Sequence, residues 1–451
     1  MEALAKIGET RPQAFYRCHT IAMQHKSTYL QRTVTATEDE FASLEGAIRT
    51  KTLLTITGRA LITDREREML RLPARKGGLG ISDPTKCARP NYSTSKASTK
   101  HLVEALIGKV QFDVSKHTKT FAQAVQENKK CANLTSDEIA KSLIHDEGPG
   151  ELPQQTKRAF ERANTHHTSG WLTIAPSTEH GTALPKEPFQ DGIAHRYAWE
   201  PPNAPLLCDA CHIPMTMEHA QTCIKGPHRI ARHNHLRDVL LSCLQRAPHE
   251  DVRRECPLPP LIQRAHQSNA NANAAKNNPN RAAGKCTKGV HEAAVDIRVK
   301  GLTNIGSVHD IDVRIMHLDS ASYAGKSTEA AFDIAVKEKK AKYEATCKEL
   351  NHTFVPFVVS TDGVLSEPAK TFLGTVAEKI AIKSQTGRGI VKAFVRAQIA
   401  VALVKGISRC LRGSRVRDHG RDRPKANEHF INAGEMRYML SNTTRHLPSV
   451  G

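Results

Sequence analysis

The chain has 451 residues and a formal net charge of +19, with 39% hydrophobic and only 5% aromatic residues. This length predicts two to four domains, and this charge predicts a polyanionic partner, most simply nucleic acid. We find no long apolar span, amphipathic anchor or secretory leader, so we expect no membrane partner. The 11 cysteines are scattered except for one cluster, which indicates a reducing compartment rather than a disulfide framework.

Residues 1–145 predict a helical region, because apolar residues recur at helical spacing in residues 38–51 and acidic residues open a second helix after Thr63. The segment Leu72–Pro84 reads LPARKGGLGISDP and contains a Gly-Gly-x-Gly run. No strand precedes this run and no Lys-Ser/Thr pair follows it, so a phosphate-binding P-loop is not expected. We predict a helical scaffold here.

Residues 146–206 are rich in Pro, Gly, His and Thr and predict a linker with short ordered pieces. This segment holds the only tryptophans of the chain, Trp171 and Trp199. We expect both to anchor a small core rather than to stack on nucleic-acid bases.

Residues 207–226 carry a Cys-x2-Cys-x7-His-x3-Cys pattern. Its members are Cys208, Cys211, His219 and Cys223. These spacings suit one tetrahedral Zn²⁺, and four protein ligands leave no open position, so we predict a structural zinc site. Neighbouring histidines remain alternatives to His219: they are His212, His228, His233 and His235.

Residues 227–383 predict an α/β domain that begins with a helix. Leu236, Leu240 and Leu244 are helically spaced in this first helix, and Asp238 is a candidate additional acid. Its arginines could contact DNA phosphates or form a solvated helix face: they are Arg229, Arg232 and Arg237. The Asn/Ala-rich residues 265–288 predict a disordered insert.

Residues 291–315 predict a β-hairpin. Strand periodicity places Asp296 on one face of the first strand, and Asp310, Asp312 and Arg314 on one face of the second. Carboxylates of adjacent strands could converge there and hold Mg²⁺, which lowers the pKa of a bound water. A polar, solvated strand face would give the same pattern.

A Lys-rich helix follows within residues 320–350 and carries Lys339, Lys342 and Tyr343. A buried-type strand at residues 354–359 and a helix at residues 368–382 complete the predicted order αβββαβ. Residues 384–424 predict a basic C-terminal helix, and residues 425–451 a tail. Two arginines of the basic helix are further candidates for phosphate contact: they are Arg412 and Arg415.

Several of these motifs resemble non-LTR retrotransposon reverse-transcriptase polyproteins that carry a restriction-like endonuclease. The LPARKGGLGISDP segment resembles the region after the palm that marks the thumb. The Cys-Cys-His-Cys pattern and the following RHNHLRD (residues 232–238) resemble the zinc knuckle and the start of the endonuclease. IDVRI (residues 311–315) and KKAKY (residues 339–343) resemble the PD-(D/E)xK nuclease motifs. The resemblance spans roughly residues 10–415.

This resemblance implies a restriction-like αβββαβ fold with a mixed sheet and Mg²⁺-dependent nicking of DNA. It implies that Asp296 and Asp312 hold the metal and that Tyr343 assists. Arg314 stands where the superfamily usually has Lys, and Arg cannot act as a general base, so Lys339 or Lys342 could take that position from the helix.

The same resemblance implies a DNA target, the RNA of the element as a second partner, no small-molecule cofactor, and a location in the nucleus or in a cytoplasmic ribonucleoprotein. We find no Tyr-x-Asp-Asp signature and no palm, so reverse transcription is not expected. The alternative function is a catalytically inactive zinc-knuckle remnant that binds DNA or RNA.

Overall fold

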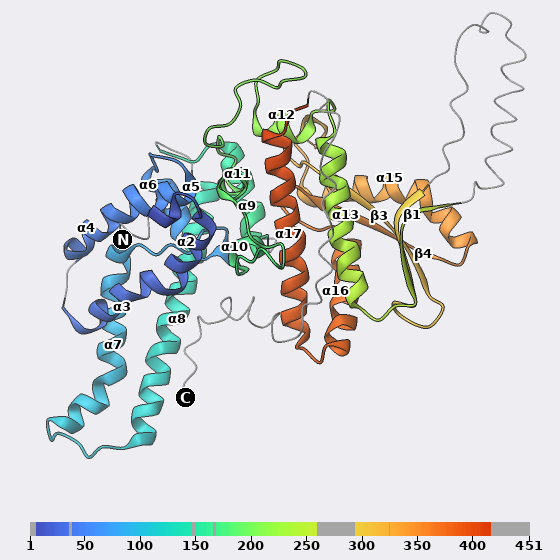
Figure 1. The fold of residues 1–451 in the computed structure, drawn as a ribbon. Helices are drawn as coiled ribbons and strands as arrows, with labels where there is room; N and C mark the ends of the chain where they lie inside the picture. The colour runs from blue at the N-terminus through green and yellow to red at the C-terminus, as the bar shows by residue number, and fades with distance from the viewer. Residues whose placement is uncertain are drawn as a thin grey trace, which may run out of the picture. The chain divides into compact units, whose positions relative to one another are not determined.

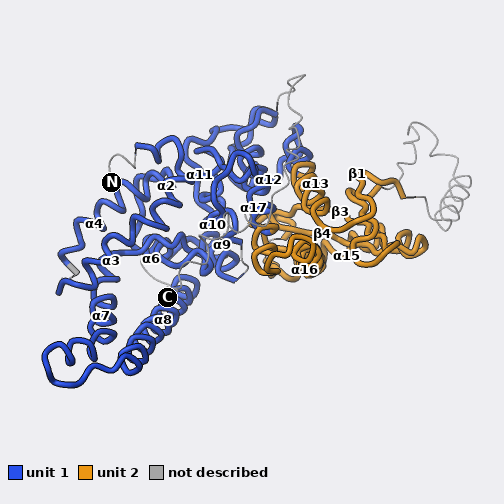
Figure 2. The backbone as a smooth tube through the Cα atoms, turned by 60° about the horizontal axis from the view of Figure 1, so that its bottom comes forward, with its two compact units in different colours: residues 1–232, 396–451 blue, residues 233–395 orange. Residues whose placement is uncertain are grey.

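The computed structural model describes residues 6–35, 38–146, 150–165, 168–258, 294–323 and 325–415. The predicted disordered insert, the last residues of the predicted basic helix and the predicted tail lie outside these ranges. The chain forms two compact units (Figure 2). Unit 1 comprises residues 1–232 and 396–451, and unit 2 comprises residues 233–395.

Unit 1 contains the predicted helical N-terminal region. Its helices are α2 (Pro12–Cys18), α3 (Gln24–Thr33), α4 (Ala42–Ala47), α5 (Leu54–Thr57), α6 (Asp64–Arg71), α7 (Pro84–Leu106), α8 (Val114–His145), α9 (Gln154–Thr165), α10 (Gly170–Thr173), α11 (Lys186–Arg196) and α12 (Met217–Thr222). The long helices α7 and α8 run side by side (Figure 1). Within the described ranges, no helix combines the length and apolar content needed to cross a membrane.

The glycine-rich segment between α6 and α7 is held by buried polar side chains. Tyr16 donates its hydroxyl to the carbonyl of Leu79 (2.7 Å), and Tyr197 donates to the carbonyl of Gly77 (3.0 Å). The guanidinium of Arg67, fully buried in α6, donates to the carbonyl of Ile81 (2.8 Å) and pairs with Glu45. These contacts satisfy backbone carbonyls that would otherwise be buried without partners, so the segment has a structural role here.

Residues 146–206 contain α9, α10 and α11 and contribute to the core of unit 1. Trp171 is buried and meets Phe189 edge-on, with ring centroids 5.6 Å apart. Trp199 is also buried, and the guanidinium of Arg59 lies 4.1 Å from its ring centroid. Both tryptophans therefore lie in a core, as the sequence predicts.

Unit 2 is built around a four-stranded mixed sheet of order β1-β2-β3-β4, as Figure 1 shows. The elements run in the order α13 (His228–Arg246), β1 (Asp251–Pro257), β2 (Ala294–Lys300), β3 (Val308–Met316), α15 (Thr328–Glu349), β4 (Thr353–Ser360) and α16 (Glu367–Lys383). The unit boundaries fall inside two helices: α13 begins in unit 1 and continues into unit 2, and α17 (Arg388–Arg412) begins in unit 2 and continues into unit 1. The pairs β1–β2 and β2–β3 are antiparallel, whereas β3–β4 is parallel. The predicted α/β class and the mixed sheet are confirmed.

Helices cover both faces of this sheet. On one face, Phe332 and Ala335 of α15 pack with Val358 of β4. On the other, Phe372 of α16 lies against His309 of β3, with ring centroids 6.3 Å apart. Because α15 covers part of the polar face of the predicted hairpin, Asp310 and Asp312 on that face are buried rather than solvated.

The glycine-rich segment generates a prediction with a matched control. A Cβ at Gly78 would lie 2.0 Å from the carbonyl oxygen of Leu72, whereas a Cβ at Gly46 in α4 would meet nothing within 4 Å. We expect Gly78→Ala to destabilise the protein by at least about 2 kcal/mol through this clash. Gly46→Ala should stabilise it by about 0.5–1 kcal/mol, because it restricts the unfolded chain. Thermal denaturation followed by circular dichroism measures both, and equal midpoints would contradict this reading of Gly78.

Candidate functional site

Four potential metal ligands meet in unit 1, as their spacing predicts. One ligand atom from each of the four residues lies within 4.8 Å of all the others. The sulfur of Cys211 is 3.2 Å from Nε2 of His219 and 4.0 Å from the sulfur of Cys223. Cys208 is fully buried and completes the cluster. These residues could hold a metal ion.

A tight turn and a short helix bring these ligands together. The turn after Cys208 closes with a β-bridge between Leu207 and Pro214, and His212 adopts a left-handed conformation (φ 56°) within it. Thr216 then caps α12 by accepting a hydrogen bond from the backbone N–H of His219 (3.1 Å). The turn therefore carries Cys208 and Cys211, and α12 with its C-terminal end carries His219 and Cys223.

Two of the alternative histidine ligands have other partners. His228 lies 2.6 Å from the carbonyl of Ser414, and His233 lies in unit 2 beside Asp296. Among the described residues, His219 is therefore the histidine that joins the three cysteines. Leu411 of α17 packs against the same cluster, so an apolar core backs the four side chains.

The two predicted acids of unit 2 come from neighbouring strands. The register pairs Ile297 of β2 with Ile311 of β3, so Asp296 and Asp312 occupy the next positions along the two strands. Burial raises the pKa of Asp312, and the nearby charge of Asp296 acts in the same direction. Both belong to the sheet face that α15 covers, where low solvent access strengthens such interactions.

Asp296 is held by a backbone amide and by a histidine. Its Oδ2 accepts a hydrogen bond from the N–H of Val313 (2.6 Å) and lies 3.2 Å from Nε2 of His233 in α13. Burial raises the pKa of Asp296, but the contacts with His233 and Val313 outweigh it and leave the pKa below its usual value. This carboxylate is therefore fixed in place and ionised.

Asp312 is deeply buried and lies beside a lysine and a tyrosine of α15. Burial raises the pKa of Asp312 above its usual value, although Lys339, its ion-pair partner, acts in the opposite direction. Burial and the charge of Asp312 raise the pKa of Tyr343 to about 12, so its hydroxyl stays protonated. Lys339, 5.7 Å from the ring centroid of Tyr343, thus supplies the cation next to Asp312.

Three other predicted residues take positions that the pattern did not show. Arg314 pairs with Glu338 and donates to the hydroxyl of Tyr323 (3.0 Å), away from Asp312. Lys342 donates to the hydroxyl of Tyr343 (2.7 Å), so it meets this tyrosine rather than the acid pair. The side chain of Asp238 pairs with Arg237 (3.1 Å) and Arg254 (3.7 Å), on the side of β1.

The predicted nucleic-acid arginines are mostly used inside the fold. Arg232 and Arg415 are buried, and Arg237 is buried against Glu255. Arg412 forms a bidentate pair with the buried Asp191 (2.8 and 2.7 Å). Arg229 alone of the five is exposed. A guanidinium that satisfies buried carboxylates or carbonyls is poorly placed to contact phosphate, which corrects the surface position expected for the other four.

Sequence reasoning missed His233 as part of the acid site. The residue was considered only as an alternative ligand for the metal cluster. The sequence holds one signal for this position: His233 is helically spaced from the buried Leu236 and Leu240. This spacing places His233 on the face of α13 that meets the sheet.

No protein-family model matches this chain, and no curated protein matches its sequence. The chemistry of the site therefore rests on the geometry described above.

The His233–Asp296 contact predicts a pH-dependent contribution to stability. Burial lowers the pKa of His233, but Asp296 outweighs it and raises the net pKa above its usual value. A raised histidine pKa stabilises the fold fully below the unfolded value of about 6.5 and loses this effect as pH rises through the folded value. In buffer without divalent metal, we expect His233→Gln to cost about 1 kcal/mol at pH 6, and less at alkaline pH. Thermal denaturation across this range measures the difference from wild type.

His249→Gln serves as the control, because the ring of His249 contacts the carbonyl of Ala247 (2.9 Å) rather than an acid. A destabilisation by His233→Gln that stays constant with pH would contradict the ion pair.

The cysteine cluster predicts about one tightly held metal ion per chain. Cys208→Ser should abolish this metal content and lower the midpoint of thermal denaturation, because the ligands would lose their common partner. The control is Cys131→Ser, since Cys131 is exposed on α8 and lies outside the cluster. Elemental analysis of the purified chain gives the content, and equal metal in both variants would exclude the site.

Proposed function

We propose that unit 2 is a metal-dependent DNA endonuclease of the restriction-like type, within a chain that resembles the C-terminal part of a non-LTR retrotransposon polyprotein. The observation that carries the proposal is the convergence of Asp296 and Asp312 from adjacent strands, with Lys339 from the covering helix beside them. The order of elements from α13 to β4 and the mixed sheet agree with this fold type.

The acid pair has the chemistry needed for a hard divalent cation. Carboxylate oxygens are preferred ligands of Mg²⁺, so Asp296 and Asp312 would hold the ion. Mg²⁺ supplies a water of lowered pKa and offsets charge on the phosphate when it is bound. Val313 and His233 already fix one oxygen of Asp296, which orients the carboxylate for this role.

The remaining residues would orient the substrate. Lys339 carries the positive charge nearest Asp312 and would hold the scissile phosphate or position the attacking water. Tyr343 keeps its proton and would donate a hydrogen bond rather than act as a base. Arg314 is engaged by Glu338 and Tyr323, so the lysine role falls to the helix rather than to the strand.

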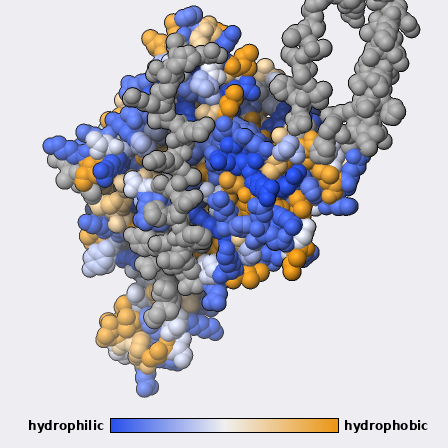
Figure 3. All heavy atoms as spheres, turned by 45° about the vertical axis from the view of Figure 1, so that its right-hand side comes forward, coloured by the Kyte–Doolittle hydropathy of each residue, from blue (hydrophilic) through white to orange (hydrophobic). Residues whose placement is uncertain are grey.

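The cluster of unit 1 would bind zinc in a structural role. Three thiolates and one imidazole are the donor set that zinc favours in closed tetrahedral sites. Such a knuckle, together with the net charge of +19, supports DNA and the RNA of the element as partners. Figure 3 shows hydrophilic side chains exposed beside smaller hydrophobic patches. We therefore place the protein in the nucleus or in a cytoplasmic ribonucleoprotein.

The second candidate function is binding without cleavage. It is favoured by the engagement of Arg314 away from the acids, because the strand position where the superfamily usually has Lys then contributes nothing to the site. A chain of this kind would still bind nucleic acid through phosphate contacts and would lose affinity steeply with salt.

Nicking of supercoiled plasmid by the purified, zinc-replete chain with Mg²⁺ or Mn²⁺ distinguishes the two functions. Asp296→Asn and Asp312→Asn should each reduce the rate more than about 100-fold, since each removes a proposed metal ligand. Asp333→Asn is the matched control, because Asp333 is an exposed acid of α15 in the same unit. Full activity of Asp312→Asn would refute the assignment, and DNA binding without any nicking would favour the second function.

A further inference from the structure

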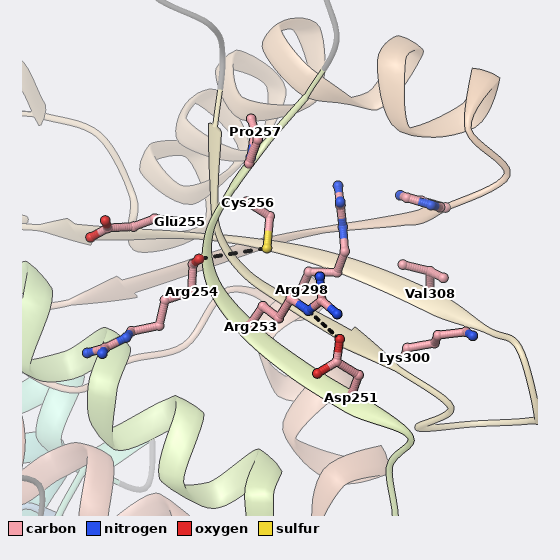
Figure 4. Close-up of a pocket in the computed structure, with 10 residues that line it drawn as sticks. Asp251, Arg253, Arg254, Glu255, Cys256, Pro257, Arg298, Lys300 and Val308 are labelled. Atoms are coloured by element: carbon pink, nitrogen blue, oxygen red, sulfur yellow. Dashed lines mark hydrogen bonds and ion pairs between the residues drawn. The ribbon is translucent and has the colours of Figure 1, made fainter.

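A pocket of about 520 Å³ lies on unit 2, at the outer edge of the sheet (Figure 4). It is formed by β1, by the ends of β2 and β3 that lie next to it, and by His352 before β4. Its size is within the range of pockets that bind small ligands or single groups of a larger one. None of the residues assigned above to the metal cluster or to the acid pair lines it.

Positive charge is concentrated on the walls of this pocket. The cationic side chains are Arg253, Arg254, Arg298 and Lys300. The first two belong to β1 and the last two to β2. Arg253, Arg298 and Lys300 share one face of the strand pair, whereas Arg254 points away from them and pairs with Asp238 of α13. Arg253 and Lys300 are well exposed, with side-chain accessibilities of 72% and 52%. An anionic group could therefore reach both.

Two of these cations stand directly opposite each other. The register pairs Arg253 with Arg298, and like charges at opposed positions of an antiparallel pair are destabilising. Arg298 is committed to the buried Asp310, which accepts from its Nε (2.6 Å) and Nη2 (3.1 Å). Nε of Arg253 contacts Asp251 (2.5 Å), and this pair is drawn in Figure 4. An anion held between the two strands would relieve the repulsion.

The acids around the pocket are already occupied. Glu255 pairs with Arg237, and Glu250 pairs with Lys300 (3.0 Å). Asp310 also accepts from Nδ1 of His352 (2.7 Å), which fixes the imidazole at the wall of the pocket. The exposed guanidinium of Arg253 and the ammonium of Lys300, which has three donors, keep hydrogen-bonding capacity for a ligand.

The pocket lies next to the acid pair along the strands. Arg253, Arg298 and Asp310 form one row across three strands, and the next positions on the same face belong to Asp296 and Asp312. A strand rises by about 3.3 Å per residue, so two residues separate the rows by about 7 Å. A chain of phosphates that passes the acid pair would therefore also pass the pocket.

We propose that this pocket binds a phosphate group of the nucleic-acid backbone beside the bond that is cut. This inference rests on the proposed nuclease function, because that function gives the backbone its path along the sheet. Arg253 and Lys300 would contact the phosphate directly, and Arg298 would be a positioning residue held by Asp310. The cations form a binding surface at some cost in stability, which is common at functional sites.

The test is the salt dependence of binding to a short DNA duplex by the full zinc-replete chain, without added Mg²⁺ or Mn²⁺. The variant is the double substitution Arg253→Gln with Lys300→Gln. Each lost phosphate contact reduces the slope of log affinity against log salt by about 0.9, so we expect a loss of about 2. Affinity at about 0.1 M salt should fall by more than roughly tenfold. The thermal midpoint should not fall, because both side chains are exposed.

Lys370→Gln with Arg388→Gln is the matched control. Both cations are partly exposed, pair with an acid and belong to the same unit. An equal loss of slope in this control, or no loss in the pocket variant, would overturn the inference. So would the absence of DNA binding by the wild type.

Competition with free thymidine monophosphate separates the two sources of phosphate. Lack of competition at millimolar concentration supports the backbone, whereas competition that the pocket variant abolishes would assign the pocket to a free nucleotide and overturn our proposal.

Nicking is measured separately. If no nicking occurs but the pocket variant still has a smaller slope of log affinity against log salt, the nuclease proposal fails and the phosphate site stands. If nicking is normal and the slope is unchanged, the nuclease proposal stands and the phosphate site fails.

Discussion

The structure of unit 2 depends on the burial of carboxylates between the sheet and α15. Asp310 is fully buried and Asp312 nearly so, and a buried charge is tolerated only when it is paired and hydrogen-bonded. Arg298 and His352 supply the partners of Asp310, and Lys339 that of Asp312. The α15 helix can therefore cover the sheet only because its own lysine and the neighbouring strand neutralise this face.

The acids of this face are not equivalent. Asp310 accepts well-formed hydrogen bonds at both carboxylate oxygens, so its interactions are complete and its role is to hold the layer together. Asp296 is fixed through one oxygen only, by Val313 and His233. Burial raises the pKa of Asp312, whereas the contacts of Asp296 keep the pKa of that carboxyl low. A divalent cation would offset the buried charge of Asp312 and bind the oxygen that Asp296 leaves unfixed, whereas both oxygens of Asp310 are already engaged.

Local patterns predicted what local geometry determines. Alternation along β2 identified the buried positions Val295 and Ile297. Ligand spacing identified the cysteine cluster, because a tight turn and one helical turn bring its ligands together. Charged side chains were harder to place. Arg232 and Arg412 look like surface cations in sequence, but their partners, Gln221 and Asp191, are brought to them by the fold. For the same reason the sequence could not show that Arg314 meets Glu338, or that His233 meets Asp296.

The two candidate sites differ in how much freedom their surroundings leave. In the cysteine cluster, four protein ligands lie against an apolar core and would fill the tetrahedral shell of a bound ion, so the ion would have no position for substrate. In unit 2 the acids come from two strands and offer few ligands, so water and phosphate could complete the shell of a bound ion. Exposed cations lie one row away along the same sheet face. The two clusters therefore differ in what they offer an ion: four protein ligands in the first, and two carboxylates in the second.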